Sequence, residues 1–250
     1  MALEEKRTDA KYLGVSTTGT FFERSKEEKD GFEKYVSEKT GAVSYRKNYT
    51  GISGYITGIY EREIEVDSAK IKMFNLEITD EGERYVVSTP LLTSKGWMDG
   101  IAASFIKAYK NIDKTKKLRF TCNRKANEKG YVNKYLFVSS VDGNSSYKPF
   151  YTKDSPNGMP DGVKKTLMGK DVWDFSEQTN FLYERFIEFA EDFKNNYKQD
   201  NMEKSGGESA PIENVEETPA QKQEQQASPS ADNVKQVDAP KEVEDDDLPF

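Results

Sequence analysis

Two nearby segments, residues 117–125 and 131–139, carry cations on the first and aromatic rings on the second. Side chains of a strand alternate between its two faces, so each segment would have an inward and an outward row. The inward rows are Leu118, Phe120 and Cys122, and Val132, Leu136 and Val138. The outward rows are Lys117, Arg119, Thr121, Asn123 and Lys125, and Tyr131, Asn133, Tyr135 and Phe137. Because cations bind phosphates and rings stack on unpaired bases, this pattern predicts a surface for a single-stranded nucleic acid.

Further cationic and aromatic residues flank these segments. The loop over residues 127–130 is bordered by Arg124 and Lys125 and contains Lys129. A second basic and aromatic cluster, earlier in the chain, would extend the surface. It consists of Tyr45, Arg46, Lys47 and Tyr49. The competing interpretation is structural, because aromatic residues of strands usually pack against neighbours and exposed lysines are usually solvated.

Residues 50–140 predict the strands and the helix that would position these side chains. The expected strands are residues 51–66, 70–79, 85–90, 117–125 and 131–139. The expected helix is residues 96–110, where Trp97, Ile101, Phe105 and Tyr109 recur every four residues. Three strands, a helix and two strands resemble the five-stranded OB barrel, which binds oligonucleotides. The expected fold class is therefore mainly β with α+β additions, and another small α+β domain is the alternative.

Two more helices are expected outside this core. Residues 179–198 place an apolar stripe on one helical face, which would pack against the barrel or, alternatively, against a second copy of the chain. The stripe consists of Leu182, Phe186, Phe189, Ala190, Phe193 and Tyr197. Residues 23–39 are the other expected helix, followed by a turn at Gly41.

The composition changes near Asn201. Residues 201–250 contain no Tyr or Trp, and Phe250 is their only Phe. Such a segment cannot bury enough apolar surface to offset its ordering entropy, so we expect it to be disordered. The expected organisation is an OB-type binding domain over residues 1–200, with the barrel core at about 50–140, followed by an acidic linker and tip over residues 201–250.

Charge is distributed unevenly along the chain. Residues 201–250 hold 4 Lys and 13 acidic residues, a net charge of −9, whereas residues 1–200 hold 33 Lys or Arg and 31 acidic residues. Residues 101–150 alone hold 11 Lys or Arg and 3 acidic residues, a net charge of +8. A localised basic region predicts a face for a polyanion, and the acidic tail is expected to compete with that polyanion.

The chain ends in three acidic residues followed by an apolar tripeptide. These residues are Asp245, Asp246, Asp247, Leu248, Pro249 and Phe250. This DDDLPF tip resembles the DDDIPF tip of bacterial single-stranded DNA-binding proteins, with Leu248 in place of Ile. Phe250 can fill an apolar pocket of a partner while its terminal carboxylate meets a cation, and the aspartates steer the tip towards basic surfaces. The alternative is an ordinary acidic tail.

The resemblance implies a non-catalytic protein that binds and protects single-stranded DNA in the cytoplasm. It also implies that the tip recruits proteins of replication, recombination and repair. Residues 1–50 and the helix after residue 178 are additions to the usual bacterial protein, which favours a divergent, bacteriophage-encoded member. Its tetrameric state is therefore not carried over, and a monomer or a homodimer is expected. RNA binding and a protein-only replication adaptor are the alternatives.

Composition disfavours several other classes of site. The chain contains no His and a single Cys, Cys122, which removes the usual general base, most zinc sites and a disulfide framework. We therefore expect no cofactor, no metal and no catalytic residue. No apolar run approaches the roughly 20 residues of a membrane-spanning helix, so no membrane association is expected. A metal-dependent nuclease is the remaining enzymatic alternative. Its available carboxylates are Asp142, Asp154, Asp161, Asp171 and Asp174.

Overall fold

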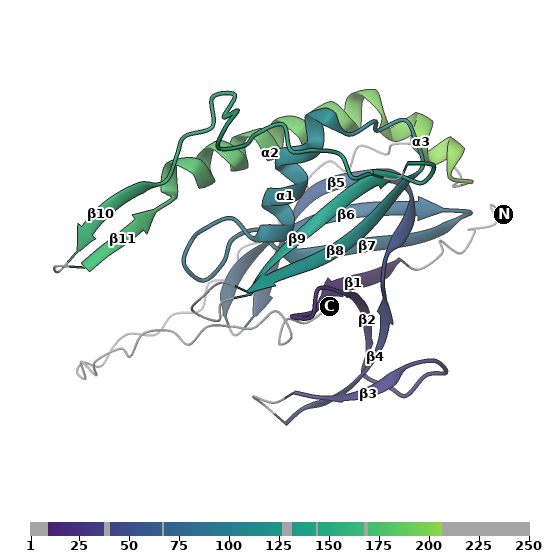
Figure 1. Cartoon of the computed structure of the whole chain (residues 1–250). Coiled ribbons are helices and arrows are strands. Elements are labelled where there is room, and N and C mark those ends of the chain that lie inside the picture. The colour runs from purple at the N-terminus through teal and green to yellow at the C-terminus, as the bar shows by residue number, and fades with distance from the viewer. Residues whose placement is uncertain are drawn as a thin grey trace, which may run out of the picture.

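The computed structural model describes residues 10–37, 41–66, 68–126, 132–143, 145–167 and 170–206. Within these residues the fold is mainly β and contains a mixed nine-stranded sheet, a separate two-stranded hairpin and a small number of helices (Figure 1). None of the described helices is long and apolar enough to cross a membrane.

Five strands lie close to their predicted positions. They are β5 (Ile52–Val66), β6 (Ala69–Asp80), β7 (Glu83–Pro90), β8 (Leu118–Ala126) and β9 (Val132–Ser140). They lie side by side in the order β7-β6-β5-β8-β9, with antiparallel neighbours throughout. Helix α1 (Gly100–Ala108) separates β7 from β8 along the chain. The predicted order of three strands, a helix and two strands is therefore confirmed.

The N-terminal residues add four strands that the sequence did not predict. They are β1 (Lys11–Val15), β2 (Phe21–Ser25), β3 (Glu33–Val36) and β4 (Val43–Tyr49). β1 pairs with β7 in parallel, which makes the sheet mixed, and the full order is β3-β4-β2-β1-β7-β6-β5-β8-β9. In Figure 1, β2, β4 and β3 extend below the body as an arm. The two outermost strands of the described sheet, β3 and β9, do not pair, so the sheet is not a closed five-stranded barrel.

The prediction of a helix over residues 23–39 is wrong. These residues contain most of β2 and all of β3, and both strands pair with β4. Lys and Glu are frequent in this stretch and are good helix formers, which explains the prediction. Pairing across the sheet overrides the local preference, because β2 buries Phe21 and Phe22 almost completely.

The sheet curls strongly although it does not close. The Nζ of Lys134 on β9 donates a hydrogen bond of 3.3 Å to the carbonyl oxygen of Val15, at the end of β1. β1 and β9 are not neighbours in the strand order. This contact therefore draws two separate parts of the sheet towards each other.

Helix α1 begins later than predicted. The Asp99 carboxylate accepts a hydrogen bond of 2.8 Å from the backbone N–H of Ile101 and caps the helix. Ile101, Phe105 and Tyr109 are buried as expected, and Tyr109 begins the short helix η1 (Tyr109–Asn111). Trp97 lies before the cap and is 37% exposed. Its predicted place on the buried face of the helix is therefore wrong.

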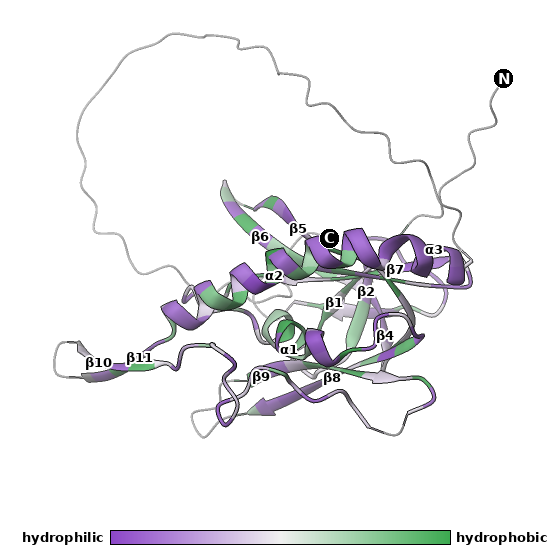
Figure 2. Cartoon of the chain, turned by 90° about the horizontal axis from the view of Figure 1, so that it is seen from above, coloured by the Kyte–Doolittle hydropathy of each residue, from purple (hydrophilic) through white to green (hydrophobic). Residues whose placement is uncertain are grey.

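Helix α2 (Ser176–Asn196) lies over the sheet and buries its apolar stripe there, as the favoured prediction states (Figure 1). Figure 2 shows both apolar and polar residues along this helix. Phe186 packs on Phe74 of β6 with ring centroids 5.6 Å apart. Leu182, Phe186, Phe189 and Phe193 are each at most 6% exposed. Burial of each such side chain contributes about 1.5–3 kcal/mol, so α2 is an integral part of the core.

The folded region continues past residue 200, where the predicted domain boundary lies. Helix α3 (Lys198–Lys204) follows α2 and carries Asn201, which is fully buried. The Asn201 side-chain amide donates to the carbonyl oxygens of Ile56 and Lys114 at 2.8 and 2.7 Å. These bonds tie α3 to β5 and to the loop before β8. The predicted linker from residue 207 and the DDDLPF tip lie outside the described residues.

Candidate nucleic-acid interface

The pairing of β8 with β9 brings the predicted cations and rings together on one face. Arg119 lies opposite Ser139, Thr121 opposite Phe137, Asn123 opposite Tyr135 and Lys125 opposite Asn133. We call this surface the β8–β9 face. It consists of Arg119, Thr121, Asn123, Lys125, Asn133, Tyr135, Phe137 and Ser139. Directly opposed side chains of a sheet lie within reach of one another, so one nucleotide would contact both strands.

Burial confirms the alternation on which this face depends. Leu118, Phe120, Leu136 and Val138 point into the core and are at most 4% exposed. Arg119, Asn123 and Lys125 are exposed on the opposite side of β8. Val132 is the exception, because it was predicted to point inward and is 38% exposed. Val132 pairs with Ala126 at the end of the hairpin, and Ala126 is exposed as well.

The rings of the β8–β9 face are available at the surface. Phe137 is 41% exposed, and Tyr135 two residues earlier is half-buried. Neither ring faces the core, where α1 packs against β9 and α2 packs against β5. Phe137 faces outward while its neighbours Leu136 and Val138 fill the core, so this ring lies outside the main core. An exposed ring beside cations is suited to stacking on an unpaired base.

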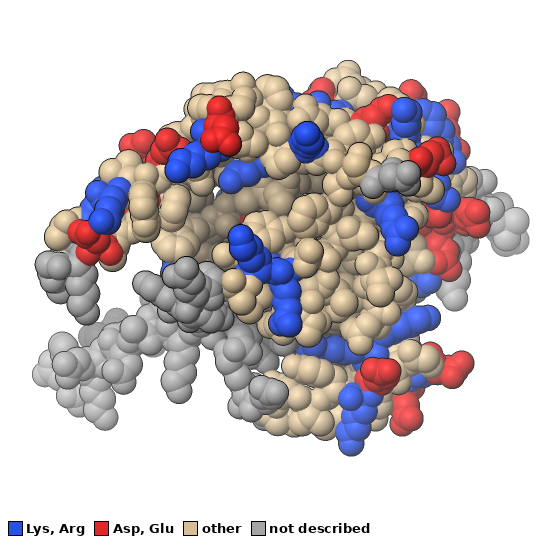
Figure 3. All heavy atoms as spheres, in the orientation of Figure 1, with Lys and Arg blue, Asp and Glu red and all other residues tan. Residues whose placement is uncertain are grey.

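The electrostatic setting favours an anion. Neither β8 nor β9 contains Asp or Glu. Figure 3 shows the side of the molecule on which β8 and β9 lie in front, where Lys and Arg are set among uncharged residues and the acidic side chains lie mostly around the rim. Figure 2 shows the end of β8 as hydrophilic. A phosphate chain crossing this face would therefore meet cations first.

Two predicted contacts have structural partners. Lys117 precedes β8, and its Nζ lies 2.7 Å from an Asp80 carboxylate oxygen, which raises the pKa of the lysine. The Asn123 side-chain oxygen accepts a hydrogen bond of 2.7 Å from the backbone N–H of Arg124, and the NH₂ group of this amide supplies two donors. Lys117 would have to exchange its partner before it could bind a phosphate. Lys129 and Tyr131 lie outside the described residues.

The cluster on β4 is divided between two faces of its strand. Arg46 is only 6% exposed, and its guanidinium carbon lies 3.3 Å from the ring centroid of Tyr35 and 4.4 Å from that of Phe22. Arg46 is therefore held between two rings inside the arm, and the prediction that it contacts DNA needs correction. Tyr45 and Lys47 point to the other side of β4, where Lys47 is exposed and Tyr45 is half-buried.

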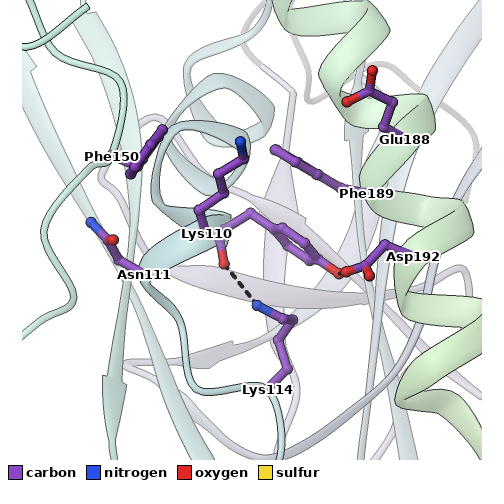
Figure 4. A pocket seen from close by; sticks show the side chains of 8 residues that line it. Lys110, Asn111, Lys114, Phe150, Glu188, Phe189 and Asp192 are labelled. Carbon is purple, nitrogen blue, oxygen red and sulfur yellow. Dashed lines mark hydrogen bonds between the residues drawn. The ribbon is translucent and has the colours of Figure 1, made fainter. Parts of the chain in front are cut away.

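A cavity of about 530 Å³ lies between η1, the loop after β9 and α2, and none of its lining residues belongs to the β8–β9 face (Figure 4). Charged side chains that line this cavity form hydrogen bonds with other groups of the chain. Lys114 donates to the carbonyl oxygens of Tyr109 and Ile112, both at 3.1 Å, and burial lowers the pKa of this lysine. The Tyr109 hydroxyl donates to Asp192 at 2.8 Å, and the Tyr109 ring stacks on Phe189. Glu188 and Asp192 in its wall would repel a phosphate, so the cavity is a weaker candidate.

The described residues offer no metal site. No three Cys, Asp or Glu side chains among them lie close enough to share an ion. Asp171 and Asp174, two carboxylates of the nuclease alternative, pair with Lys164 and Lys165. These ion pairs lower the pKa of both carboxyl groups.

The structure also groups aromatic residues that the sequence did not bring together. Trp97 and Phe175 are in contact, and Trp173 stacks on Phe175. The sequence offered one signal for this group. The chain has only two tryptophans, and Trp173 ends a short segment, residues 163–173, that contains three lysines. No family model, no curated protein and no solved structure matches the chain.

Proposed function

We propose that the chain is a non-catalytic protein that binds and protects single-stranded DNA during replication, recombination and repair. One observation carries the proposal. The register of β8 and β9 sets exposed cationic and amide side chains directly beside Tyr135 and Phe137 on one surface.

Each kind of side chain on the β8–β9 face has a role in this proposal. Arg119 and Lys125 neutralise phosphates, and the arginine offers a planar pair of donors to one phosphate group. Tyr135 and Phe137 stack on unpaired bases, which requires no particular sequence because every base has a π face. The amides of Asn123 and Asn133 donate hydrogen bonds to base edges or sugars.

The fold supports an OB-type platform for this surface. β5 pairs with both β6 and β8, so the five strands are neighbours in the order β7-β6-β5-β8-β9, and the buried residues of α1 belong to the core beside them. The Lys134–Val15 contact links β9 to β1, the strand that pairs with β7. We include an OB-type core in the proposal, with β1 added in parallel to the edge at β7.

The proposed recruitment of replication, recombination and repair proteins rests on the DDDLPF sequence of residues 245–250. In the proposal, the chain is a divergent, bacteriophage-encoded protein that acts in the cytoplasm of the bacterial host. A monomer or a homodimer would carry one or two copies of this tip.

Direct titration of labelled oligonucleotides tests the proposed function. The full chain is titrated with oligo-dT, the matching RNA and a DNA duplex at several salt concentrations. We expect the oligo-dT to bind most tightly and the logarithm of its affinity to fall linearly with the logarithm of salt concentration, because bound cations release counterions.

A double charge reversal identifies the surface. The variant Arg119→Glu/Lys125→Glu should weaken oligo-dT binding about 100-fold at low salt, because two attractive charges become repulsive. The matched control Lys194→Glu/Lys198→Glu makes the same change in net charge at exposed positions of α2 and α3. Equal losses in both variants would leave only a net-charge effect, and no binding by the unmodified chain would favour the protein-only adaptor. If RNA bound more tightly than DNA, the proposed ligand would be RNA, and the β8–β9 face would remain its proposed binding surface.

A further inference from the structure

Trp97, Phe175 and Trp173 form one aromatic surface, which we call the tryptophan cluster. Trp97 meets Phe175 edge to face with ring centroids 5.3 Å apart, and Trp173 stacks on Phe175 at 6.1 Å and an interplanar angle of 21°. The two tryptophans are the only ones in the chain, and 75 residues separate them in sequence. The fold therefore gathers every indole at one place.

The cluster is exposed although its rings touch. Trp173 is 55% exposed and Trp97 is 37% exposed. A tryptophan retained for core packing is largely buried, because most of its stabilisation comes from the large area that it removes from water. Two neighbouring indoles that remain in solvent mark a binding surface.

The backbone around the cluster holds the rings in place. Trp173 lies on β11 (Lys170–Asp174), which pairs with β10 (Val163–Leu167) in a hairpin that projects from the start of α2 (Figure 1). The Phe175 ring lies so close to Gly162 that a Cβ atom there would come within 2.3 Å of it. The backbone N–H of Thr93 donates to the Trp97 carbonyl oxygen at 2.7 Å. Rigid rings lose little conformational entropy when they bind a flat ligand.

Cations border the rings. The Lys95 Nζ lies 5.7 Å from the Trp97 ring centroid, and Lys164 is directly opposite Trp173 in the hairpin. Lys164 and Lys165 pair with Asp171 and Asp174 on the exposed hairpin. Exposed ion pairs contribute at most about 1 kcal/mol, so a phosphate can replace either aspartate. Lys95 and the hairpin segment 163–174 contain four Lys and two Asp, a net charge of +2 in a chain of net charge −7.

The cluster is also connected to β9 through the start of α1. A Cβ atom at Gly100 would come within 2.2 Å of the carbonyl oxygen of Lys134 on β9, so the helix start is pressed against that strand. Trp97 lies three residues before this contact, and the Ser104 hydroxyl of the same helix accepts a hydrogen bond from the Leu136 N–H at 2.8 Å. The start of α1 therefore holds Trp97 within three residues of a contact with β9.

We propose that the tryptophan cluster is a second contact for single-stranded DNA, beyond the β8–β9 face, and this inference rests on the proposed function. Unpaired bases stack on Trp97 and Trp173, and Lys95 and Lys164 contact the flanking phosphates. The cluster lengthens the stretch of DNA that one chain covers.

Tryptophan fluorescence reports on this site alone, because the β8–β9 face contains Tyr and Phe but no Trp. The full chain is titrated with oligo-dT of increasing length, while tryptophan emission and the anisotropy of the labelled oligonucleotide are recorded together. We expect emission to be quenched as the oligonucleotide binds. We also expect quenching to increase with oligonucleotide length until both contacts are covered.

Paired substitutions complete the test. Trp97→Ala/Trp173→Ala should weaken binding of a long oligo-dT about 10-fold or more and leave a short one nearly unchanged, since stacking contributes about 1–3 kcal/mol per base. Trp97→Phe/Trp173→Phe retains the rings and should bind like the unmodified chain, which separates stacking from folding. Circular dichroism of both variants checks that the fold is intact.

The possible outcomes separate this inference from the proposed function. Binding without quenching, together with unchanged affinity in the alanine variant, would overturn the cluster as a DNA contact and leave the β8–β9 face intact. Absence of any oligo-dT binding would overturn both. If the alanine variant changed only the sedimentation of the chain, the tryptophans would be a contact between copies, and the inference would also be overturned.

Discussion

The β8–β9 face and the N-terminal arm contain the same kinds of side chain but use them in opposite ways. On the β8–β9 face, Arg119 and Phe137 are both exposed on one outer surface. In the arm, Arg46 is buried between Tyr35 and Phe22. In the first arrangement the cations and rings are accessible to a ligand, whereas in the second they pack against one another inside the fold.

The difference comes from strand pairing. Arg46 lies opposite Arg24 of β2 and Glu33 of β3, in the middle of a three-stranded layer, and rings from both neighbours cover it. β9 is the outermost strand beside β8, and beyond it the described chain adds only an isolated bridge between Ser139 and Ser146. Position within the sheet therefore decides whether a basic and aromatic pattern is exposed or buried.

Thiol labelling gives the largest expected contrast and tests the alternation on β8. Burial raises the pKa of Cys122 to about 12. The native thiol should therefore react about a thousandfold more slowly than an exposed cysteine near neutral pH. The variant Cys122→Ser/Asn123→Cys moves the thiol by one residue to the exposed side, where it should react quickly. Both folded proteins are treated with a reagent that releases a chromophore when it reacts with a thiol. Equal reaction rates for the unmodified chain and the variant would show that side chains of β8 do not alternate between a buried and an exposed face.

Removal of both rings from the β8–β9 face should have the next largest effect. Tyr135→Ala/Phe137→Ala should weaken oligo-dT binding by about 2–4 kcal/mol, because each lost ring removes one stacking contact. The control Tyr45→Ala removes a half-buried ring from the arm and should change affinity little. Competition anisotropy measures both variants. An equal loss in both would show that the arm contacts DNA as strongly as the β8–β9 face does.

Arg46 should matter for stability more than for DNA binding. Arg46→Ala should lower the free energy of unfolding by about 2 kcal/mol, because a desolvated guanidinium between two rings is lost. Lys47→Ala, the exposed neighbour on β4, should change it by less than about 0.5 kcal/mol. Urea denaturation at neutral pH measures both free energies. A stable Arg46→Ala protein that had lost DNA affinity would reverse the roles assigned to the arm and the β8–β9 face.

Deletion of the acidic tail should have the smallest effect of the four. A chain ending at Gly206 lacks most of the acidic residues of the segment with net charge −9 and should bind oligo-dT about 5-fold more tightly at low salt. The gain should disappear at high salt, because screening removes the competition. Replacement of Asp245, Asp246 and Asp247 by Asn in the full chain is the matched variant of the tip. Unchanged affinity after deletion would contradict competition between the tail and the DNA.

Local patterns predicted the central elements well. Leu118, Phe120, Leu136 and Val138 alternate with polar residues, and that period places them inside. The stripe from Leu182 to Phe193 repeats with the helical period, and it is buried as expected. Strands with long apolar alternation and helices with a continuous stripe carry their own signal, because one face of each must leave water.

The missed parts lack such a local signal. β3 has four residues and is mostly exposed, and the stretch before it is rich in Lys and Glu, so propensity favoured a helix. Trp97 fell on the helical period of Phe105, yet the Asp99 cap begins the helix after it. The hairpin β10–β11 is short, and Trp173 becomes part of an aromatic cluster only through Phe175 and Trp97, which lie outside the hairpin.

The sequence by itself determined the periods, the localised basic charge of residues 101–150 and the DDDLPF tip, because these depend only on the order of residues along the chain. Tertiary structure alone decided that Arg46 is buried while Arg119 is exposed, and that Trp97 meets Trp173 through Phe175. Exposure and contact between distant residues depend on which strand or helix packs alongside. That choice is made by the free energy of the whole core rather than by any local run of residues.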